Sequence, residues 1–120
     1  MFTLMLLFAS VIAVTVAVPE VTSIRDAARA AGLLREMKLP ARLLVNRMRP
    51  QLSRRGDAPN ALEMVELICL PLLGVVPEDE DVPYALNRGI PLRECNYFAE
   101  RAYENIAKRL VGQRVPLLKI

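Results

Sequence analysis

The stretch Leu70–Pro77 limits the possible folds of this 120-residue chain more than any other, because it is an apolar run that is followed directly by acidic residues. Its residues read Leu-Pro-Leu-Leu-Gly-Val-Val-Pro, and Glu78-Asp79-Glu80-Asp81 follow directly. A short apolar run of this kind is typical of a strand buried on both faces of a parallel sheet. Because Pro77 cannot donate a hydrogen bond to a neighbouring strand, we expect the strand to end there. The acidic corner is then the candidate site.

Composition excludes several kinds of chemistry. The chain has no histidine, so Ser-His catalysis, Cys-His catalysis and an ordinary zinc site are ruled out. Cys69 and Cys95 lack the spacing of a metal site or a disulfide framework, and we expect both to be free, buried thiols in a reducing compartment. The net charge of +3 comes from scattered basic residues without interleaved aromatics, which disfavours nucleic-acid binding.

The first eighteen residues contain no charged side chain and allow two interpretations. They are long enough for a short membrane span or the apolar part of a signal peptide, although no Lys or Arg precedes Arg25. Alternatively, only Val11–Val18 forms a buried strand, since this segment is rich in β-branched residues and stops at Pro19. The residues themselves leave both interpretations open.

Further elements follow from periodicity and turn residues. Thr22–Glu36 has apolar residues at three- and four-residue steps and is predicted as an amphipathic helix capped by Thr22 or Ser23. Ala41–Val45 is predicted as a second strand that runs out at Asn46. The segment from Arg47 to Asp57 has the Pro, Gly and charge of a surface loop.

Three helices are predicted in the second half of the chain. The first is opened by a capping box of Asn60 and Glu63, runs to Pro71, and turns Leu62, Val65 and Ile68 inward. The second lies near Val82–Arg88 and is stopped by Gly89. The last is capped by Asn96 and ends at Gly112. Its inward-facing residues are Phe98, Ala102, Ile106 and Leu110, and its outward-facing residues are Glu100, Arg101, Glu104, Lys108 and Arg109. Strands that alternate with helices predict an α/β fold.

Five motifs in order resemble the C-terminal half of the MinD family, the deviant-Walker P-loop ATPases that help place the bacterial division septum. The motifs are Pro19–Ala27, Leu44–Pro50, Arg55–Asp57, Leu72–Asp79 and Asn87–Leu92. The resemblance implies about three strands with flanking helices of a parallel P-loop NTPase sheet. Residues 11–120 would form this part of the ATPase domain, and residues 1–10 have no counterpart that aligns.

The resemblance also implies a nucleotide site for ATP or ADP with magnesium. In the family, the asparagine that matches Asn46 meets the adenine, and the loop that matches Pro77-Glu78-Asp79 lines the other side of the base, largely through its backbone. Arg47 follows Asn46 and completes the expected nucleotide-binding set. The residues alone favour Asn46 as a turn residue that satisfies its own backbone and Glu78–Asp81 as a solvated acidic loop, and for Asn46 the resemblance reverses that preference.

Partners are implied in the same way. The helix after Pro19-Glu20 is a surface that MinC and MinE use in the family, and Arg25, Asp26 and Arg29 are the polar residues here that would face them. Members of the family also form dimers. They are cytoplasmic proteins that bind the surface of the inner membrane through a helix, which would follow the last residues of this chain.

Catalysis is not assigned to any residue of the chain, nor is a metal ligand. The glycines at positions 32, 56, 74, 89 and 112 include no Gly-Lys pair, so the sequence contains no P-loop. We therefore expect a fragment or truncated product of an ATPase that retains the adenine-binding edge and the partner helix, and binds nucleotide weakly or not at all alone. The alternative is a small membrane-anchored interaction protein that uses residues 1–18 as a span.

Overall fold

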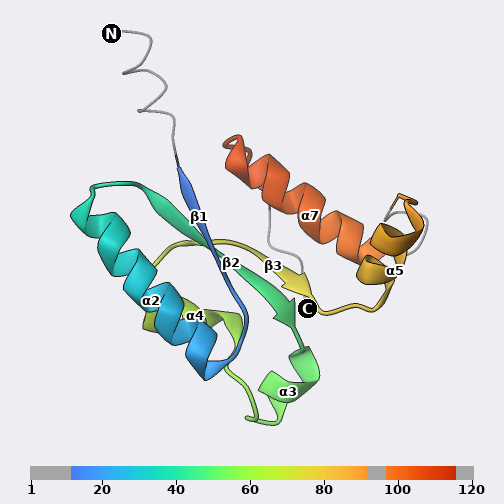
Figure 1. The fold of residues 1–120 in the computed structure, drawn as a ribbon, viewed down its shortest axis with the longest axis horizontal. Helices are drawn as coiled ribbons and strands as arrows, with labels where there is room; N and C mark the ends of the chain where they lie inside the picture. Colours follow the sequence, from blue (N-terminus) through green and yellow to red (C-terminus); the bar gives the residue numbers. More distant parts are fainter. Residues whose placement is uncertain (1–11, 92–96, 116–120) are drawn as a thin grey trace, which may run out of the picture.

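The computed structural model describes residues 12–91 and 97–115, which form a three-stranded parallel sheet flanked by helices (Figure 1). The strands are β1 (Ala13–Ala17), β2 (Ala41–Met48) and β3 (Leu72–Pro77), in the spatial order β1-β2-β3. The helices are α2 (Val21–Glu36), α3 (Pro50–Arg54), α4 (Ala61–Ile68), α5 (Asp81–Arg88) and α7 (Tyr97–Leu110). The predicted α/β class is confirmed.

The sheet is covered on both faces. Helices α2 and α4 lie on one face and α7 lies on the other, over β3 (Figure 1). Two groups of buried side chains result, one on the α2 and α4 face and one under α7. The first comprises Ala17, Ile24, Ala27, Ala31, Leu43, Val45, Met48, Met64, Ile68 and Leu70. The second comprises Leu73, Val76, Ala102 and Ile106. Strand β3 supplies Leu73 and Val76 to the second group, and its half-buried Leu72 and Val75 pack against the first.

The N-terminal apolar segment contains strand β1, which pairs in parallel with β2 from Ala13 to Ala17. This supports the interpretation of Val11–Val18 as a strand rather than as the second half of a membrane span. Residues 1–11 lie outside the described part of the chain. Among the described residues, none of the helices has both the length and the apolar character needed to cross a bilayer.

Three boundaries in the first half differ from prediction. Neither Thr22 nor Ser23 caps α2; both lie inside the helix, and Ser23 Oγ accepts a hydrogen bond from the Val18 amide instead. Strand β2 continues past Val45 to Met48, because β3 pairs with it as far as Pro77. The predicted loop after it contains the short helix α3, which begins at Pro50, where a proline suits the first helical turn.

Helix α4 confirms one prediction and corrects two. The Asn60 side chain accepts a hydrogen bond from the Glu63 amide at 2.9 Å, as a cap should. Leu62, however, is 67% exposed, and Met64 is buried in its place. Cys69 ends the helix in the left-handed conformation with φ 63°, so its free thiol is exposed rather than buried. Cys95 lies outside the described residues.

The last two helices follow the predicted pattern in part. Gly89 ends α5 with φ 65°, as expected, and Ala102 and Ile106 of α7 are buried. Leu110 is exposed, whereas Arg109 turns inward and donates hydrogen bonds to the carbonyl oxygens of Leu73 (2.7 Å) and Leu72 (3.0 Å). The predictions that Leu110 lies inside and Arg109 outside were both wrong. The guanidinium of Arg109 forms charge-assisted hydrogen bonds with carbonyl oxygens of β3, which helical spacing does not reveal. Asn96 and the Phe98 side chain are not described.

Candidate functional site

The candidate site lies where β2 and β3 end side by side. Between Val45 and Met48 strand β2 advances three residues while β3 advances two, from Val75 to Pro77, so the register shifts. Arg47 takes up the extra residue with φ 55°, a left-handed conformation that is uncommon for a residue with a side chain. Backbone strain of this kind is common at binding sites, and here it redirects the side chains at the end of β2.

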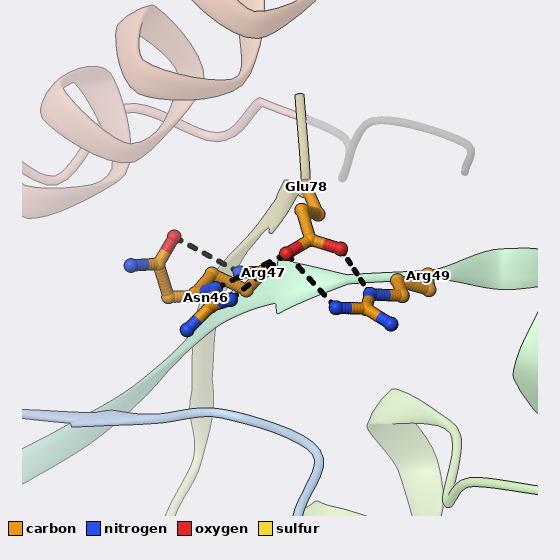
Figure 2. Close-up of polar contacts among 4 residues, drawn as sticks. All are labelled: Asn46, Arg47, Arg49 and Glu78. Atoms are coloured by element: carbon orange, nitrogen blue, oxygen red, sulfur yellow. Dashed lines mark hydrogen bonds and ion pairs between the residues drawn. The ribbon is translucent and has the colours of Figure 1, made fainter. Parts of the chain in front are cut away.

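Glu78 joins the two strand ends. Its carboxylate accepts hydrogen bonds from Arg47 Nε at 3.3 Å and Nη2 at 3.0 Å, and it also accepts from Arg49, with Nη2 at 3.1 Å (Figure 2). A further contact joins Arg49 Nε to Glu78 Oε2. The Glu78 amide donates to the Met48 carbonyl at 2.9 Å. Both the backbone and the side chain of Glu78 therefore hold the β3–α5 loop against β2.

The two guanidinium groups change the acid–base behaviour of Glu78. Hydrogen bonds from Arg49 and then from Arg47 hold the pKa of the carboxyl group below its ordinary value. The same hydrogen bond from Arg49 to Glu78 raises the pKa of the arginine further. Glu78 is therefore ionised at neutral pH and paired with Arg47 and Arg49, while the residue itself remains exposed to solvent.

Asn46 lies beside this ion-pair group, beyond Arg47 (Figure 2). Its Oδ1 atom accepts a hydrogen bond from the following amide, that of Arg47, at 3.0 Å. This is the self-satisfying contact expected of a turn residue, although Asn46 sits in a strand. The assignment leaves the two N–H groups of the side-chain amide available to a ligand.

A cleft of about 710 Å³ borders all five residues expected to bind nucleotide: Asn46, Arg47, Pro77, Glu78 and Asp79. Arg49 and Glu80 also line it, together with a group of apolar and aromatic residues: Val76, Val82, Pro83, Leu86 and Tyr103. A volume in this range suits a small organic ligand, and a mixture of polar and apolar lining suits a planar, hydrogen-bonding ring.

The arrangement fits a nucleotide base better than a metal ion. Among residues 12–91 and 97–115 no group of three or more Cys, Asp and Glu side chains stands close enough to hold a metal. We assign no metal ligand among these residues. An amide edge and apolar walls, by contrast, match what a heteroaromatic ring needs.

Several residues that border the cleft were not predicted from the sequence, among them Arg49, Leu86 and Tyr103. Arg49 donates a hydrogen bond to Glu78, which lies 29 residues away along the chain. Tyr103 of α7 and Leu86 of α5 border the cleft. Their local patterns offer no signal, because Arg49 sits among other loop charges and Tyr103 lies on the exposed side of an amphipathic helix. Only the packing of α7 on β3 brings Tyr103 to the cleft.

The residues expected to face a partner form a separate surface on α2. Arg25, Asp26 and Arg29 are all exposed, and none of them borders the cleft. Arg25 and Arg29 lie one turn apart, so their side chains share a face of the helix.

Comparison with known proteins identifies the fold. A curated relative, the septum site-determining protein MinD of Bacillus subtilis, is 41% identical over 108 residues, which are 88% of this chain and 40% of that protein. The solved MinD cell division protein of Aquifex aeolicus is 34% identical, with a TM-score of 0.83 over 90% of this chain and 47% of that one. Over these residues the chain belongs to the MinD family. It spans about two fifths of the length of the curated MinD relatives that it matches.

Two further MinD structures extend the comparison. A MinC:MinD cell division protein complex from Aquifex aeolicus matches with a TM-score of 0.83 at 34% identity. MinD of Pyrococcus horikoshii, solved in complex with Mg-ADP, matches with a TM-score of 0.69 at 21% identity and shows the fold alone. They cover 90% and 84% of this chain and are covered to 45% and 41%. No protein-family model matches the chain.

Proposed function

We propose that the chain works in bacterial division-site selection as the part of a MinD-type ATPase that forms the adenine-binding edge. The observation that carries this proposal is the grouping of Asn46 with Pro77, Glu78 and Asp79 around one cleft, in a chain 41% identical to a septum site-determining MinD. The ligand is ADP or ATP, as the Mg-ADP complex of the Pyrococcus relative suggests. Because phosphate-cradling residues are absent from the sequence, binding by this chain alone is expected to be weak and without turnover.

Each residue has a distinct role in this proposal. The side-chain amide of Asn46 donates to the edge of the base, and Tyr103 and Leu86 flank the ring. Glu78, held by Arg47 and Arg49, keeps the loop at Pro77–Asp79 in place as the opposite wall. The ion-pair group thus positions the site rather than contacting the reacting phosphates.

Titration of the isotope-labelled chain with ADP, followed by NMR, tests the proposal. We expect shifts to concentrate at residues 46–49, 76–86 and 103, and Asn46→Ala to weaken binding about five- to tenfold through loss of a hydrogen bond. Asn87→Ala is the matched control, since this exposed amide on α5 does not border the cleft. Shifts centred elsewhere, or equal affinities of the two variants, would contradict the proposal.

The partner surface is proposed on α2. Arg25, Asp26 and Arg29 are exposed on α2, and an Aquifex relative is known in a MinC:MinD complex, so we propose these residues for MinC or MinE contact. Reversing the charge of Arg25 and Arg29 to Glu should abolish capture by MinC, whereas Arg54→Glu on α3 should not. Unchanged capture by the double variant would reject this surface. Self-association and a cytoplasmic position at the inner membrane surface are proposed from the family resemblance.

A further inference from the structure

A second cleft lies at the opposite end of the sheet from the nucleotide edge, beside the start of β3. It has a volume of about 600 Å³, and three arginines line it: Arg42 of β2, Arg109 of α7 and Arg114 after that helix. The other described residues that line it are Pro71, Leu72, Gly112, Gln113 and Val115, and none of these carries a carboxylate. Three positive charges therefore share one concave surface.

Two of these guanidinium groups are held in fixed positions. Arg109 donates through Nε, Nη1 and Nη2 to the carbonyl oxygens of Leu73, Val115 and Leu72, at 2.7, 2.9 and 3.0 Å. Arg42 Nη1 donates to the Arg109 carbonyl at 3.2 Å. Because a guanidinium has five N–H groups, two remain on Arg109 and four on Arg42. These donors are preorganised, so little entropy is lost when a ligand binds them.

Among the described residues, no acidic side chain pairs with an arginine of this cleft. Within residues 12–91 and 97–115 the ion pairs are Arg47–Glu78, Arg49–Glu78 and Arg55–Asp57, and none of them includes an arginine of this cleft. The partners of Arg42 and Arg109 are neutral carbonyls. An electropositive hollow of this kind concentrates anions.

We propose that this cleft binds a phosphate group. Guanidinium groups that approach from three elements suit a tetrahedral oxyanion with several terminal oxygens better than a single planar carboxylate. The volume exceeds that of phosphate and leaves room for the molecule that carries it. This site is independent of the adenine-binding cleft, so either proposal can fail while the other stands.

Calorimetric titration of the chain with inorganic phosphate tests the site. We expect saturable binding, weakened about tenfold by Arg114→Gln and by Arg42→Gln, because each change removes charge-assisted donors. Arg114 is exposed, and its side chain forms no hydrogen bond or ion pair with the described residues, so its variant should fold normally. Arg101→Gln, an equally exposed change on α7 outside the cleft, should bind phosphate as the unmodified chain does.

A second arm separates free phosphate from a lipid headgroup. Co-sedimentation compares vesicles of phosphatidylcholine with vesicles that also contain phosphatidic acid. Retention on phosphatidic acid that Arg114→Gln abolishes supports a lipid-borne phosphate, and binding of inorganic phosphate without retention supports a free one. The proposal is overturned if the chain binds neither inorganic phosphate nor phosphatidic acid vesicles. It is also overturned if Arg114→Gln and Arg42→Gln leave the affinities unchanged.

Discussion

Gly74 and Ile106 approach each other so closely that a Cβ atom on Gly74 would lie 2.3 Å from Cγ1 of Ile106. The contact joins β3 to α7, whose Ala102 and Ile106 form one buried group with Leu73 and Val76. Tyr103 lies one turn before Ile106 on the same helix and borders the nucleotide cleft. Because Gly74 has no side chain, α7 can lie close to β3, and this places Tyr103 at the nucleotide cleft.

We predict that Gly74→Ala destabilises the chain. The added methyl group forces α7 or Ile106 to move, and overpacking of this kind costs about 1–3 kcal/mol in the free energy of unfolding. Urea denaturation measures it. Combining Gly74→Ala with Ile106→Ala removes the clashing atoms, so the double variant should be more stable than the sum of the single changes implies. Strict additivity would show that the two residues do not meet.

Stability should depend on the ionisation of Glu78. Since its folded pKa is lowered, the stabilisation it provides is present above the unfolded Glu pKa of about 4.3 and is lost as the pH falls through the folded value. Glu78→Gln should therefore be less stable than the unmodified chain at pH 7, and the difference should vanish in acid. Glu104→Gln, exposed on α7, is the control and should show no such convergence. A pH-independent difference would argue against the ion-pair group.

Tyr103 should contribute to nucleotide affinity. If it flanks the base, Tyr103→Ala should weaken ADP binding about tenfold, because stacking of a base on an aromatic ring is worth about 1–3 kcal/mol. Tyr84→Ala offers a matched comparison, since this tyrosine is also exposed but packs against Arg88 outside the cleft. Equal ADP affinities for the two variants, measured by calorimetry, would remove Tyr103 from the site.

Helix α4 should depend on its cap. Asn60→Ala removes the acceptor of the Glu63 amide and should lower the free energy of unfolding by about 1 kcal/mol. Asn60→Asp, which retains an oxygen acceptor, should restore most of the loss in urea denaturation. A loss shared equally by both variants would point to a role other than capping.

Local patterns in the sequence predict β2, β3, most of the helices and the order in which they alternate, whereas they leave β1 open against a membrane span. The apolar runs at β1, β2 and β3, the cap at Asn60 and the stop at Gly89 are local signals, since each depends on residues close together along the chain. The motifs that point to MinD are local in the same sense. Leu62 and Leu110 show the limit of such signals. Both fit the apolar spacing of their helices but are exposed, because spacing does not reveal which part of a helix has a neighbour to pack against.

How the strand ends form a site depends on contacts between segments that are distant along the chain. The shift of register between β2 and β3 gives Arg47 its left-handed backbone, and Glu78 meets Arg47 and Arg49 across 31 and 29 residues of chain. Arg109 likewise turns inward toward carbonyl oxygens of β3, 36 and 37 residues away. Such contacts depend on register and packing between distant segments, which side-chain periodicity along one segment does not encode.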